Sequence, residues 1–345
     1  MEEFSPKRRV LATLLGGKVD RKPVTSVAGC AGTVSIDMQK AGGVYLPEAH
    51  KDAQSMAKLA LLGAELTGIE CVRVPFDFVV EPEALGCEIK WENKAESVPA
   101  VMGHPYKSPE DLKKPEKLLE MGRIPVILDS IRILRREVGD RLPIASTALG
   151  PYTIAGELAG IDNIMKWLMQ KPGYVRDFIA FAKGITIEFA KAQYQAGSDI
   201  VQVAEPLASL SMLSPLRPPP PSSARIFREF LKSPLSEVAR SLGGLRVLHI
   251  CGETRGIETD MAETGFDGIS IEAVDVAHVK SIVGDVKILG NVSSSKTLMF
   301  GSPDDVKAEA RKSLNEGVDL LEPTCGIPLT APLENVKAMV EEAES

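Results

Sequence analysis

The amino-acid sequence predicts an α/β protein folded as a single (β/α)8 (TIM) barrel over residues 1–345, with an extra N-terminal helix. Three observations support this fold class. The chain has 345 residues, of which 44% are hydrophobic, and this is enough for one large core. Short runs rich in valine and isoleucine recur without strict alternation, as in strands that are buried on both faces. Amphipathic stretches with a helical period separate these runs, and strands that alternate with helices close into a barrel.

Eight strands are expected along the chain. They cover residues 24–30, 69–77, 142–150, 199–206, 247–252, 268–274, 287–293 and 319–325. The extra helix lies within residues 1–20, and the clearest helices between strands lie at 173–197 and 302–317. In the last of these, Ser302 is placed to act as the N-cap and Gly317 to end the helix.

Two segments depart from the alternation of strands and helices. Residues 78–120 form a long polar excursion after the second strand. Residues 214–225 include four consecutive prolines, which cannot lie inside a helix or a central strand. We expect a stiff, exposed loop in polyproline II geometry at the rim of the barrel. Docking of a partner on this loop is an alternative that the sequence does not support further.

Charge and cysteine content exclude several classes of protein. The net charge of −7 argues against a nucleic-acid surface, which usually needs a basic patch. No window of about 18 uncharged apolar residues is present, so we expect no membrane span, and the N-terminus lacks the apolar segment of a signal peptide. Five cysteines in so long a chain do not form a disulfide scaffold. These features predict a cytoplasmic protein with free thiols.

The fifth expected strand carries a histidine and a cysteine two residues apart, His249 and Cys251. Alternate residues of a strand share a face, so both side chains point the same way at the carboxyl end of the strand. Cys325 ends the eighth strand in the same manner, and active sites of these barrels lie at this end. One imidazole and two thiolates suit zinc and leave its fourth position open, which is typical of a catalytic site. A His-x-Cys pair alone more often packs in a core, but a third soft ligand favours a metal.

Several motifs resemble one known family. They are "HICG" on the fifth strand, "ISIEA" on the sixth, "ILGNVSS" on the seventh and "PTCGIPLTAPLENVKAMV" at the end. These motifs are similar to the uroporphyrinogen decarboxylase-like superfamily, and more closely resemble its methylcobamide:coenzyme M methyltransferase branch. The similarity covers nearly the whole chain, and the His-x-Cys pair with its distant cysteine is the most specific part.

The resemblance implies a zinc-dependent enzyme that moves a methyl group from a methylated corrinoid to the thiol of coenzyme M, as in methanogenesis from methylated compounds. It implies that His249, Cys251 and Cys325 bind the zinc. Two thiolates and a neutral imidazole offset the charge of Zn²⁺, so a bound substrate thiolate keeps much of its nucleophilicity. The sequence shows no cobalamin-binding module, so we expect the methylcobamide to arrive on a corrinoid protein that docks at the barrel mouth.

The resemblance also implies a glutamate that occupies the open metal position until substrate arrives, and Glu272 on the sixth strand matches that place. A carboxylate buried at a barrel mouth needs a partner, which agrees with this role. The incoming thiol would then displace Glu272, and Glu272 would accept the thiol proton. The alternative is an acid that supports the ligands or caps a helix without touching the metal.

Further polar residues are candidates for the substrate site. The sulfonate of coenzyme M needs a cationic or amide recess, and Arg73 on the second strand and Asn291 at the end of the seventh are placed to provide it. A structural salt bridge and a turn-stabilising amide are the respective alternatives. Glu205, which ends the fourth strand, either orients a ligand or caps the following loop. Cys30 ends the first strand and would line the pocket, whereas His50, in a proline-flanked polar segment, is expected to be solvated.

Three rival functions remain open. The first is methyl transfer from a folate to a thiol, as in the cobalamin-independent methionine synthases, which have a similar zinc barrel; their chain is expected to be about twice as long. The second is non-catalytic binding of a corrinoid or a thiol. The third, uroporphyrinogen decarboxylation, is disfavoured because residues 28–50, which correspond to the arginine-rich motif of those decarboxylases, contain no arginine to clamp a substrate with many carboxylates.

Overall fold

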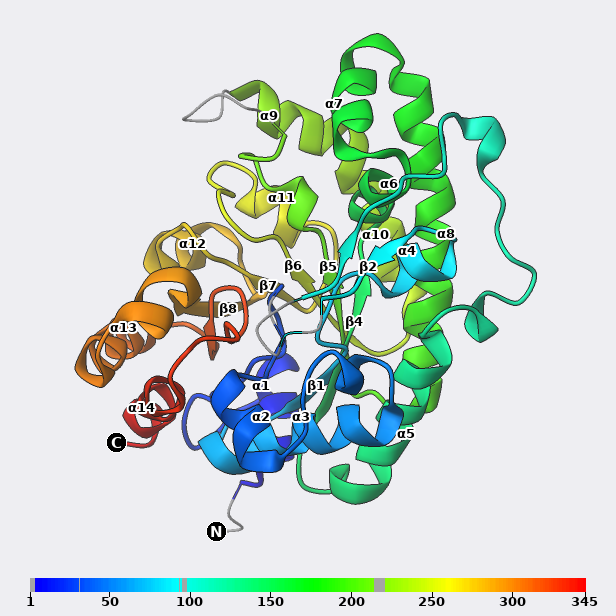
Figure 1. The fold of residues 1–345 in the computed structure, drawn as a ribbon. Coiled ribbons are helices and arrows are strands. Elements are labelled where there is room, and N and C mark those ends of the chain that lie inside the picture. Colours follow the sequence, from blue (N-terminus) through cyan, green and yellow to red (C-terminus); the bar gives the residue numbers. More distant parts are fainter. Residues whose placement is uncertain (1–3, 31, 93, 95–97, 214–220) are drawn as a thin grey trace.

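The structure, a computed structural model, describes residues 4–30, 32–92, 94, 98–213 and 221–345. Its centre is a curled parallel sheet of seven strands in the order β1-β4-β5-β6-β7-β8-β9 (Figure 1). These strands are β1 (Val72–Val74), β4 (Ile144–Leu149), β5 (Ile200–Ala204), β6 (Leu245–His249), β7 (Gly268–Ser270), β8 (Lys287–Val292) and β9 (Leu320–Pro323). Every residue of β4 and β5 is buried, as expected for strands covered on both faces.

The segment around Val24 closes the sheet into a barrel. Val24 forms a parallel bridge with Leu321 of β9, and the amide of Thr25 donates to the Leu321 carbonyl at 2.9 Å. On the other side, the amide of Glu70, just before β1, donates to the Val24 carbonyl at 2.8 Å. The predicted (β/α)8 barrel is therefore confirmed, with its first strand reduced to a single bridge.

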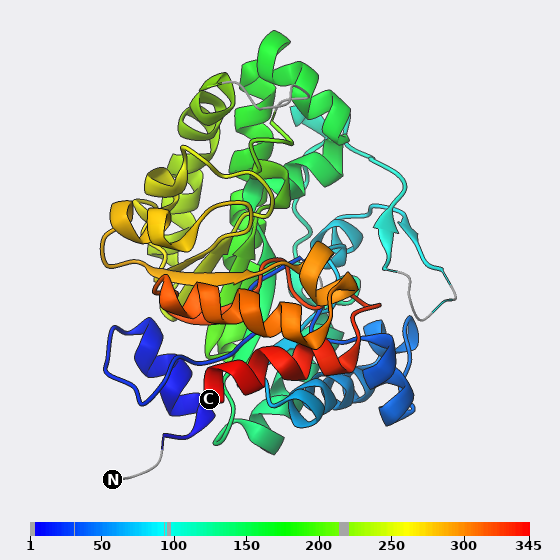
Figure 2. The same cartoon turned by 90° about the vertical axis from the view of Figure 1, so that its left-hand side faces the viewer.

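Helices surround the sheet. They are α1 (Pro6–Leu14), α2 (Ile36–Gly42), α3 (Ala53–Thr67), α4 (Val80–Ala84), α5 (Ile124–Val138), α6 (Pro151–Ala159), α7 (Ile161–Gln170), α8 (Pro172–Ala196), α9 (Pro221–Ile226), α10 (Lys232–Ser241), α11 (Glu258–Ala262), α12 (Val276–Ile282), α13 (Pro303–Asn315) and α14 (Leu333–Glu344). In Figure 1, α5 and α8 cover one side of the barrel and α12, α13 and α14 the opposite side; Figure 2 shows α13 and α14 side by side. Within the described residues, no helix is long and apolar enough to cross a membrane.

Shorter elements complete the chain. Short helical turns are η1 (Glu48–His50), η2 (Pro109–Asp111), η3 (Leu118–Glu120), η4 (Pro206–Ala208), η5 (Phe227–Leu231) and η6 (Ser294–Leu298). The polar excursion at 78–120 contains α4, η2, η3 and an antiparallel hairpin of β2 (Ile89–Lys90) and β3 (Ala100–Val101). It thus has local structure of its own, which its polar composition did not indicate.

The extra N-terminal helix α1 lies at the amino ends of the barrel strands. The amide of Lys7 donates to the carbonyl of Arg141, just before β4, at 3.0 Å. The Lys7 ammonium lies 3.0 Å from the carboxylate of Asp199, just before β5. The helix therefore contacts the end of the barrel opposite to the carboxyl ends of the strands, where the site is expected.

Helix α13 confirms the predicted ends of the helix at 302–317, whereas α9 corrects the predicted loop at 214–225. Ser302 caps α13 by accepting from the Asp305 amide at 3.3 Å, and Gly317 follows the helix with φ +91°. Of the predicted proline loop 214–225, residues 214–220 lie outside the described part. The rest is helical, because α9 begins at Pro221, and the first position of a helix tolerates proline since its N–H would have no partner there.

Candidate metal centre

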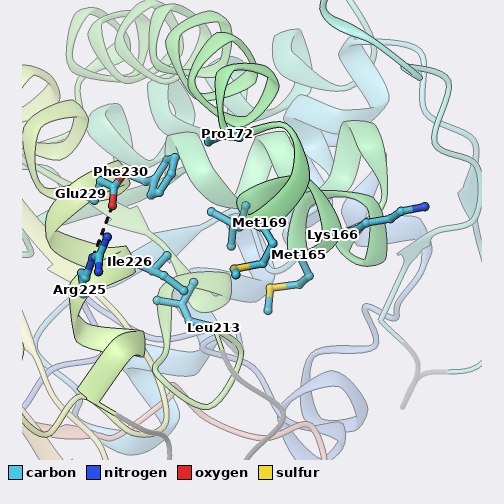
Figure 3. Close-up of a pocket in the computed structure, with 10 residues that line it drawn as sticks. Met165, Lys166, Met169, Pro172, Leu213, Arg225, Ile226, Glu229 and Phe230 are labelled. Carbon is cyan, nitrogen blue, oxygen red and sulfur yellow. Dashed lines mark ion pairs between the residues drawn. The ribbon is translucent and has the colours of Figure 1, made fainter.

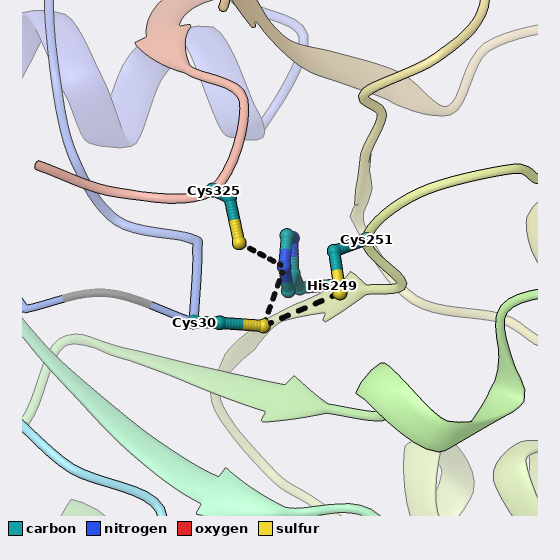
Figure 4. A group of neighbouring side chains, drawn as sticks. All are labelled: Cys30, His249, Cys251 and Cys325. Carbon is teal, nitrogen blue, oxygen red and sulfur yellow. Dashed lines mark hydrogen bonds between the residues drawn. The ribbon is translucent and has the colours of Figure 1, made fainter. Parts of the chain in front are cut away.

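Three cysteines and one histidine meet at the carboxyl ends of the strands. They are Cys30, His249, Cys251 and Cys325, whose ligand atoms all lie within 4.8 Å of one another. Figure 4 shows His249 and Cys251 arriving from the end of β6, Cys325 from the segment after β9, and Cys30 from the segment that closes the barrel. The predicted convergence of His249, Cys251 and Cys325 is present, and Cys30 joins them.

The distances between these atoms leave room for one shared ion. Cys30 Sγ lies 3.3 Å from His249 Nε2 and 3.5 Å from Cys251 Sγ. Cys325 Sγ lies 3.9 Å from the same His249 nitrogen. Thiolates and an imidazole at such separations are the donor set of a soft or borderline metal ion, so the residues present fit the metal that the pattern predicts.

Glycines turn the chain directly after two of the cysteines. Gly252 follows Cys251 with φ +73°, and Gly326 follows Cys325 with φ +81°. Both angles lie in the left-handed region, where a side chain would be strained. Each turn lies just beyond the end of its strand, β6 or β9, and leaves the thiol at the barrel mouth.

The second ring nitrogen of His249, Nδ1, has a hydrogen-bond partner of its own. His249 is fully buried, and its Nδ1 lies 3.0 Å from the hydroxyl of Ser270, which ends β7. Since Nε2 faces the sulfur atoms, Nδ1 carries the proton and donates it to Ser270 Oγ when Nε2 binds a metal. Ser270 therefore fixes the orientation of the imidazole.

Ser270→Ala is expected to weaken metal binding by about 10–100-fold, because the ring loses the partner that holds it in place. Metal affinity by competition with a chromophoric chelator measures the change. Ser146→Ala is the matched control: Ser146 is a buried barrel serine whose hydroxyl bonds Gln193 and Ser198 instead, both 2.9 Å away. Equal metal affinity in Ser270→Ala and the wild type would show that Ser270 does not position the ring.

The three thiols differ in acidity. Hydrogen bonds from Cys251 and Cys30 hold the pKa of Cys325 well below its usual range. Hydrogen bonds to Cys251 and Cys325, together with burial, raise the pKa of Cys30 well above its usual range. The bond from Cys30 lowers the pKa of Cys251, but the bond to Cys325 and burial raise it by more. Metal ligands bind deprotonated, so binding of an ion releases protons here and weakens as the pH falls.

Glu272 lies next to the cluster without belonging to it. Its carboxylate accepts a hydrogen bond from the backbone amide of Gly252, directly after Cys251. Burial raises the pKa of Glu272 above its ordinary value, and the charge of Cys325 adds to this, whereas the Gly252 bond opposes it. Two residues, Cys30 and Glu272, therefore lie near the predicted fourth position, and of these only Cys30 belongs to the cluster.

The structure separates the two candidates for the sulfonate. Arg73 is 1% exposed and lies inside the barrel, where it donates to the Gly29 carbonyl at 2.7 Å. Asn291 faces α13 instead: its amide donates to the Val274 carbonyl at 2.8 Å, beside a small cavity of about 210 Å³ that Glu272 also lines. The two side chains thus do not form one recess at the barrel mouth.

Glu205 caps a helix. Its two carboxylate oxygens accept from the amides of Tyr152 and Thr153, the second and third residues of α6, at 2.9 and 2.8 Å. This places the carboxylate at the positive end of the helix dipole. Burial raises the pKa of Glu205 to about 7, although the Tyr152 and Thr153 hydrogen bonds oppose the increase.

Glu205→Gln is expected to change how stability depends on pH. The folded protein holds the Glu205 proton up to about pH 7, whereas the unfolded chain releases it near the ordinary value of 4.5. This contribution to stability is therefore complete below pH 4.5 and is lost as the pH rises through 7. Between these values the wild type loses stability relative to Glu205→Gln, by up to about 1.4 kcal/mol per pH unit. Denaturant unfolding at several pH values measures this, with the exposed Glu116→Gln as control; parallel curves for all three proteins would contradict it.

Sequence reasoning placed Cys30 near the pocket but did not identify it as a possible ligand. One signal was available in the sequence: Cys30, which is one of only five cysteines, ends the first expected strand directly after a glycine. The prediction for His50 was wrong, because this side chain is fully buried and pairs with the carboxylate of Asp77 at 2.8 Å.

A larger cavity of about 730 Å³ lies between α7 and the α9–η5 segment. Figure 3 shows Met165 and Met169 of α7 facing Ile226 and Phe230 across it. The ligand cluster does not contribute to its lining within the described residues. Its lining is mainly apolar and includes no histidine or cysteine among the described residues, so the chemistry is assigned to the cluster.

Comparisons with known proteins identify the same family that the sequence motifs resemble. The uroporphyrinogen decarboxylase (URO-D) family matches residues 5–345. The chain is 39% identical to a methylcobamide:CoM methyltransferase MtaA of Methanosarcina barkeri, over 99% of this chain and 98% of that protein. It is also similar to the solved structure of a methyltransferase from Methanosarcina mazei, with 40% identity, a TM-score of 0.92 and 99% of each chain covered.

A more distant likeness bears on the folate rival. A B12-independent methionine synthase from Shewanella matches with a TM-score of 0.57 and 17% identity, over 94% of this chain and 95% of that one. At this identity the likeness shows the fold alone. This chain covers 95% of that one, so the expected twofold difference in length does not hold for this synthase chain.

Proposed function

The chain belongs to the uroporphyrinogen decarboxylase family, in its methylcobamide:CoM methyltransferase branch, and on this premise we propose that it transfers a methyl group from a methylated corrinoid to the thiol of coenzyme M. The observation that carries the proposal is the meeting of His249, Cys251 and Cys325 at the barrel mouth. Decarboxylation of a substrate with many carboxylates is not favoured, since residues 28–50 contain no arginine.

The metal is proposed to be zinc, held by His249, Cys251 and Cys325. Two thiolates and an imidazole are ligands of catalytic zinc, which keeps one position for substrate. When bound, zinc would supply charge that keeps a substrate thiol deprotonated at neutral pH. The buried imidazole and the strand ends hold these ligands in place before substrate arrives, so little reorganisation is needed.

Glu272 is proposed as the group that accepts the proton of coenzyme M. It lies beside the ligands without being part of the cluster, and its carboxylate is held by the Gly252 amide. A carboxylate that is partly withdrawn from water is suited to take a proton at neutral pH. This retains the proton transfer that the sequence suggested for Glu272.

The methyl donor is proposed to be a methylcobamide on a separate corrinoid protein, which docks at the carboxyl ends of the strands where the cluster opens. The methylcobamide:CoM methyltransferase name of the relatives supports this donor. A reducing cytoplasm is the proposed location, because the five cysteines are all free thiols. Arg73 is proposed to balance the negative charge of the thiolates from within the barrel rather than to meet the sulfonate directly.

The experiment that tests the proposal is a choice of methyl donors and acceptors. The zinc-loaded protein is given methylcobalamin or methyltetrahydrofolate as donor, and coenzyme M or homocysteine as acceptor. We expect methyl-coenzyme M from methylcobalamin, and at most slow transfer in the other combinations. Methylation of homocysteine from the folate would favour the methionine-synthase rival. Zinc binding without turnover of either donor would favour a non-catalytic binder.

A further inference from the structure

Cys30 is a thiol of the cluster that the proposed zinc ligands leave free. Its Sγ lies 3.5 Å from Cys251 Sγ and 3.3 Å from His249 Nε2 (Figure 4). The two sulfur atoms of a disulfide are about 2.0 Å apart, so a movement of about 1.5 Å would join Cys30 to Cys251. A free thiol therefore lies within reach of one of the proposed ligands.

Contacts from distant strands hold Cys30 at this place. Arg73 of β1 and Gln202 of β5 both donate to the carbonyl of Gly29, at 2.7 and 3.2 Å. A Cβ on Gly29 would lie 2.2 Å from the amide nitrogen of Gly326, so only glycine lets the chain before Cys30 pack directly against that backbone. The meeting of two thiols that are 221 residues apart in the sequence therefore depends on the barrel itself.

Small oxidants can reach the thiols of the cluster. Cys30, Cys251 and Cys325 are each partly exposed, whereas Cys71 and Cys87 are buried. Oxidation of a cysteine begins at the thiolate and depends on its exposure. Cys251, as a proposed metal ligand, is deprotonated when the metal is bound. A partly exposed thiolate with a second thiol beside it is the arrangement of a redox-sensitive cysteine pair.

Resting on the proposed function, we propose that Cys251 and Cys30 form a reversible disulfide when a hydroperoxide reaches the cluster, and that this bond releases the metal. In the first step the Cys251 sulfur attacks hydrogen peroxide: an S–O bond forms, the O–O bond breaks and hydroxide leaves, so Cys251 is oxidised to a sulfenic acid and the peroxide is reduced. In the second step the Cys30 sulfur attacks the Cys251 sulfur, the S–O bond breaks, and the leaving hydroxide takes up the Cys30 proton to form water.

The disulfide removes one of the three proposed ligands. A sulfur atom in a disulfide has no thiolate charge, and metal ligands bind deprotonated. His249 and Cys325 remain, which is fewer than the three protein ligands of a catalytic zinc site. The metal is therefore lost, and methyl transfer stops, for as long as the disulfide persists.

Cys30 makes this loss of activity reversible. A sulfenic acid without a neighbouring thiol is oxidised further to a sulfinic acid, which thiol reductants do not restore. A disulfide, in contrast, is returned to two thiols by thiol–disulfide exchange. Cys30 thus protects Cys251 from permanent oxidation, a role that differs from binding the metal.

Treatment of the zinc-loaded full chain with hydrogen peroxide tests the proposal. Mass spectrometry of peptides digested without reduction is expected to show Cys30 linked to Cys251, while a chromophoric chelator detects the release of about one zinc per chain. Dithiothreitol and added zinc should then restore methyl transfer. In Cys30→Ala we expect no such link, a sulfinic acid at Cys251 and little recovery with the reductant. Cys87→Ser, which alters a buried thiol outside the cluster, should behave like the wild type.

The wild-type peptides decide the role of Cys30 even if Cys30→Ala does not fold, and Cys30→Ser, which also cannot form a disulfide, then serves as the second variant. A link between Cys251 and Cys325 instead, or a sulfinic acid at Cys251 without any link, would overturn this role. Zinc that stays bound after Cys30 and Cys251 are linked would overturn the release of metal.

The proposed function is judged separately, by methyl transfer from methylcobalamin to coenzyme M in the reduced, zinc-loaded protein. Methyl transfer by this protein without a Cys30–Cys251 link after peroxide treatment would remove the disulfide and leave the proposed function intact. The link in a protein that transfers no methyl group before oxidation would remove the proposed function and leave the disulfide intact.

Discussion

Cys325→Ala is expected to lose most of its zinc and to slow methyl transfer from methylcobalamin to coenzyme M by about 10³-fold or more. A metal ion contributes several kcal/mol to such a reaction, and about 1.4 kcal/mol corresponds to a factor of ten in rate. Cys325 is one of the three residues proposed to bind the metal, and hydrogen bonds from Cys251 and Cys30 hold the pKa of its thiol well below the usual range. Its loss should therefore weaken the site more than the loss of a single hydrogen bond would.

Elemental analysis and the rate of methyl-coenzyme M formation measure these two effects. Cys71→Ala is the matched control, because Cys71 is a buried barrel thiol that lies outside the cluster and accepts from the Ser26 amide. The control is expected to keep its zinc and its activity, with a modest loss of stability. Full zinc content and full activity in Cys325→Ala would rule out Cys325 as a ligand.

Glu272→Gln is expected to keep its zinc while its turnover falls by about 10²-fold, the loss typical of one acid–base group. The glutamine oxygen can still accept from the Gly252 amide, so the local structure should persist. The amide cannot take up a proton, and for this reason the thiol of coenzyme M would lack its acceptor.

Glu253→Gln is the control for this variant. Glu253 follows Gly252 in the loop after β6, accepts from the Arg255 amide and lies outside the cluster. It should show wild-type turnover, so that a general loss of negative charge is separated from the loss of the acceptor. Unchanged turnover in Glu272→Gln would assign Glu272 a supporting role; loss of zinc in it would mean that the carboxylate is needed to form the site.

The sequence was sufficient for the barrel and for three members of the cluster because both depend on local regularities. Buried valine-rich runs show the strands, and the two-residue period of a strand places His249 and Cys251 on one face. The shared carboxyl end of parallel strands then brings Cys325 to the same mouth. None of these inferences requires knowing which residues far apart in the sequence are in contact.

Cys30 could not be placed in the cluster in this way, because its segment is a strand only at the Val24 bridge. The chain beyond it follows contacts with Arg73, Gln202 and Glu322, which lie far away in the sequence. A strand period says nothing about a side chain in such a segment.

The same limit explains the other differences. Asn291 donates to the Val274 carbonyl and lines a small cavity with residues of α13, and the composition of the strand does not reveal these contacts. Glu205 meets the amino end of α6 because neighbouring strands end at the same height, and His50 is buried because Asp77, 27 residues later, returns to its side. Each outcome depends on a tertiary contact rather than on the local sequence.

The central claim is that a metal held by this cluster enables methyl transfer to coenzyme M. The most direct test measures methyl-coenzyme M formed from free methylcobalamin by the wild-type protein as prepared, after removal of metal by a chelator, and after zinc is added back. The account predicts product with the loaded protein, a loss of nearly all activity on removal of metal, and recovery with about one zinc per chain. Full activity of the metal-free protein, or no product from the protein loaded with zinc, would contradict it.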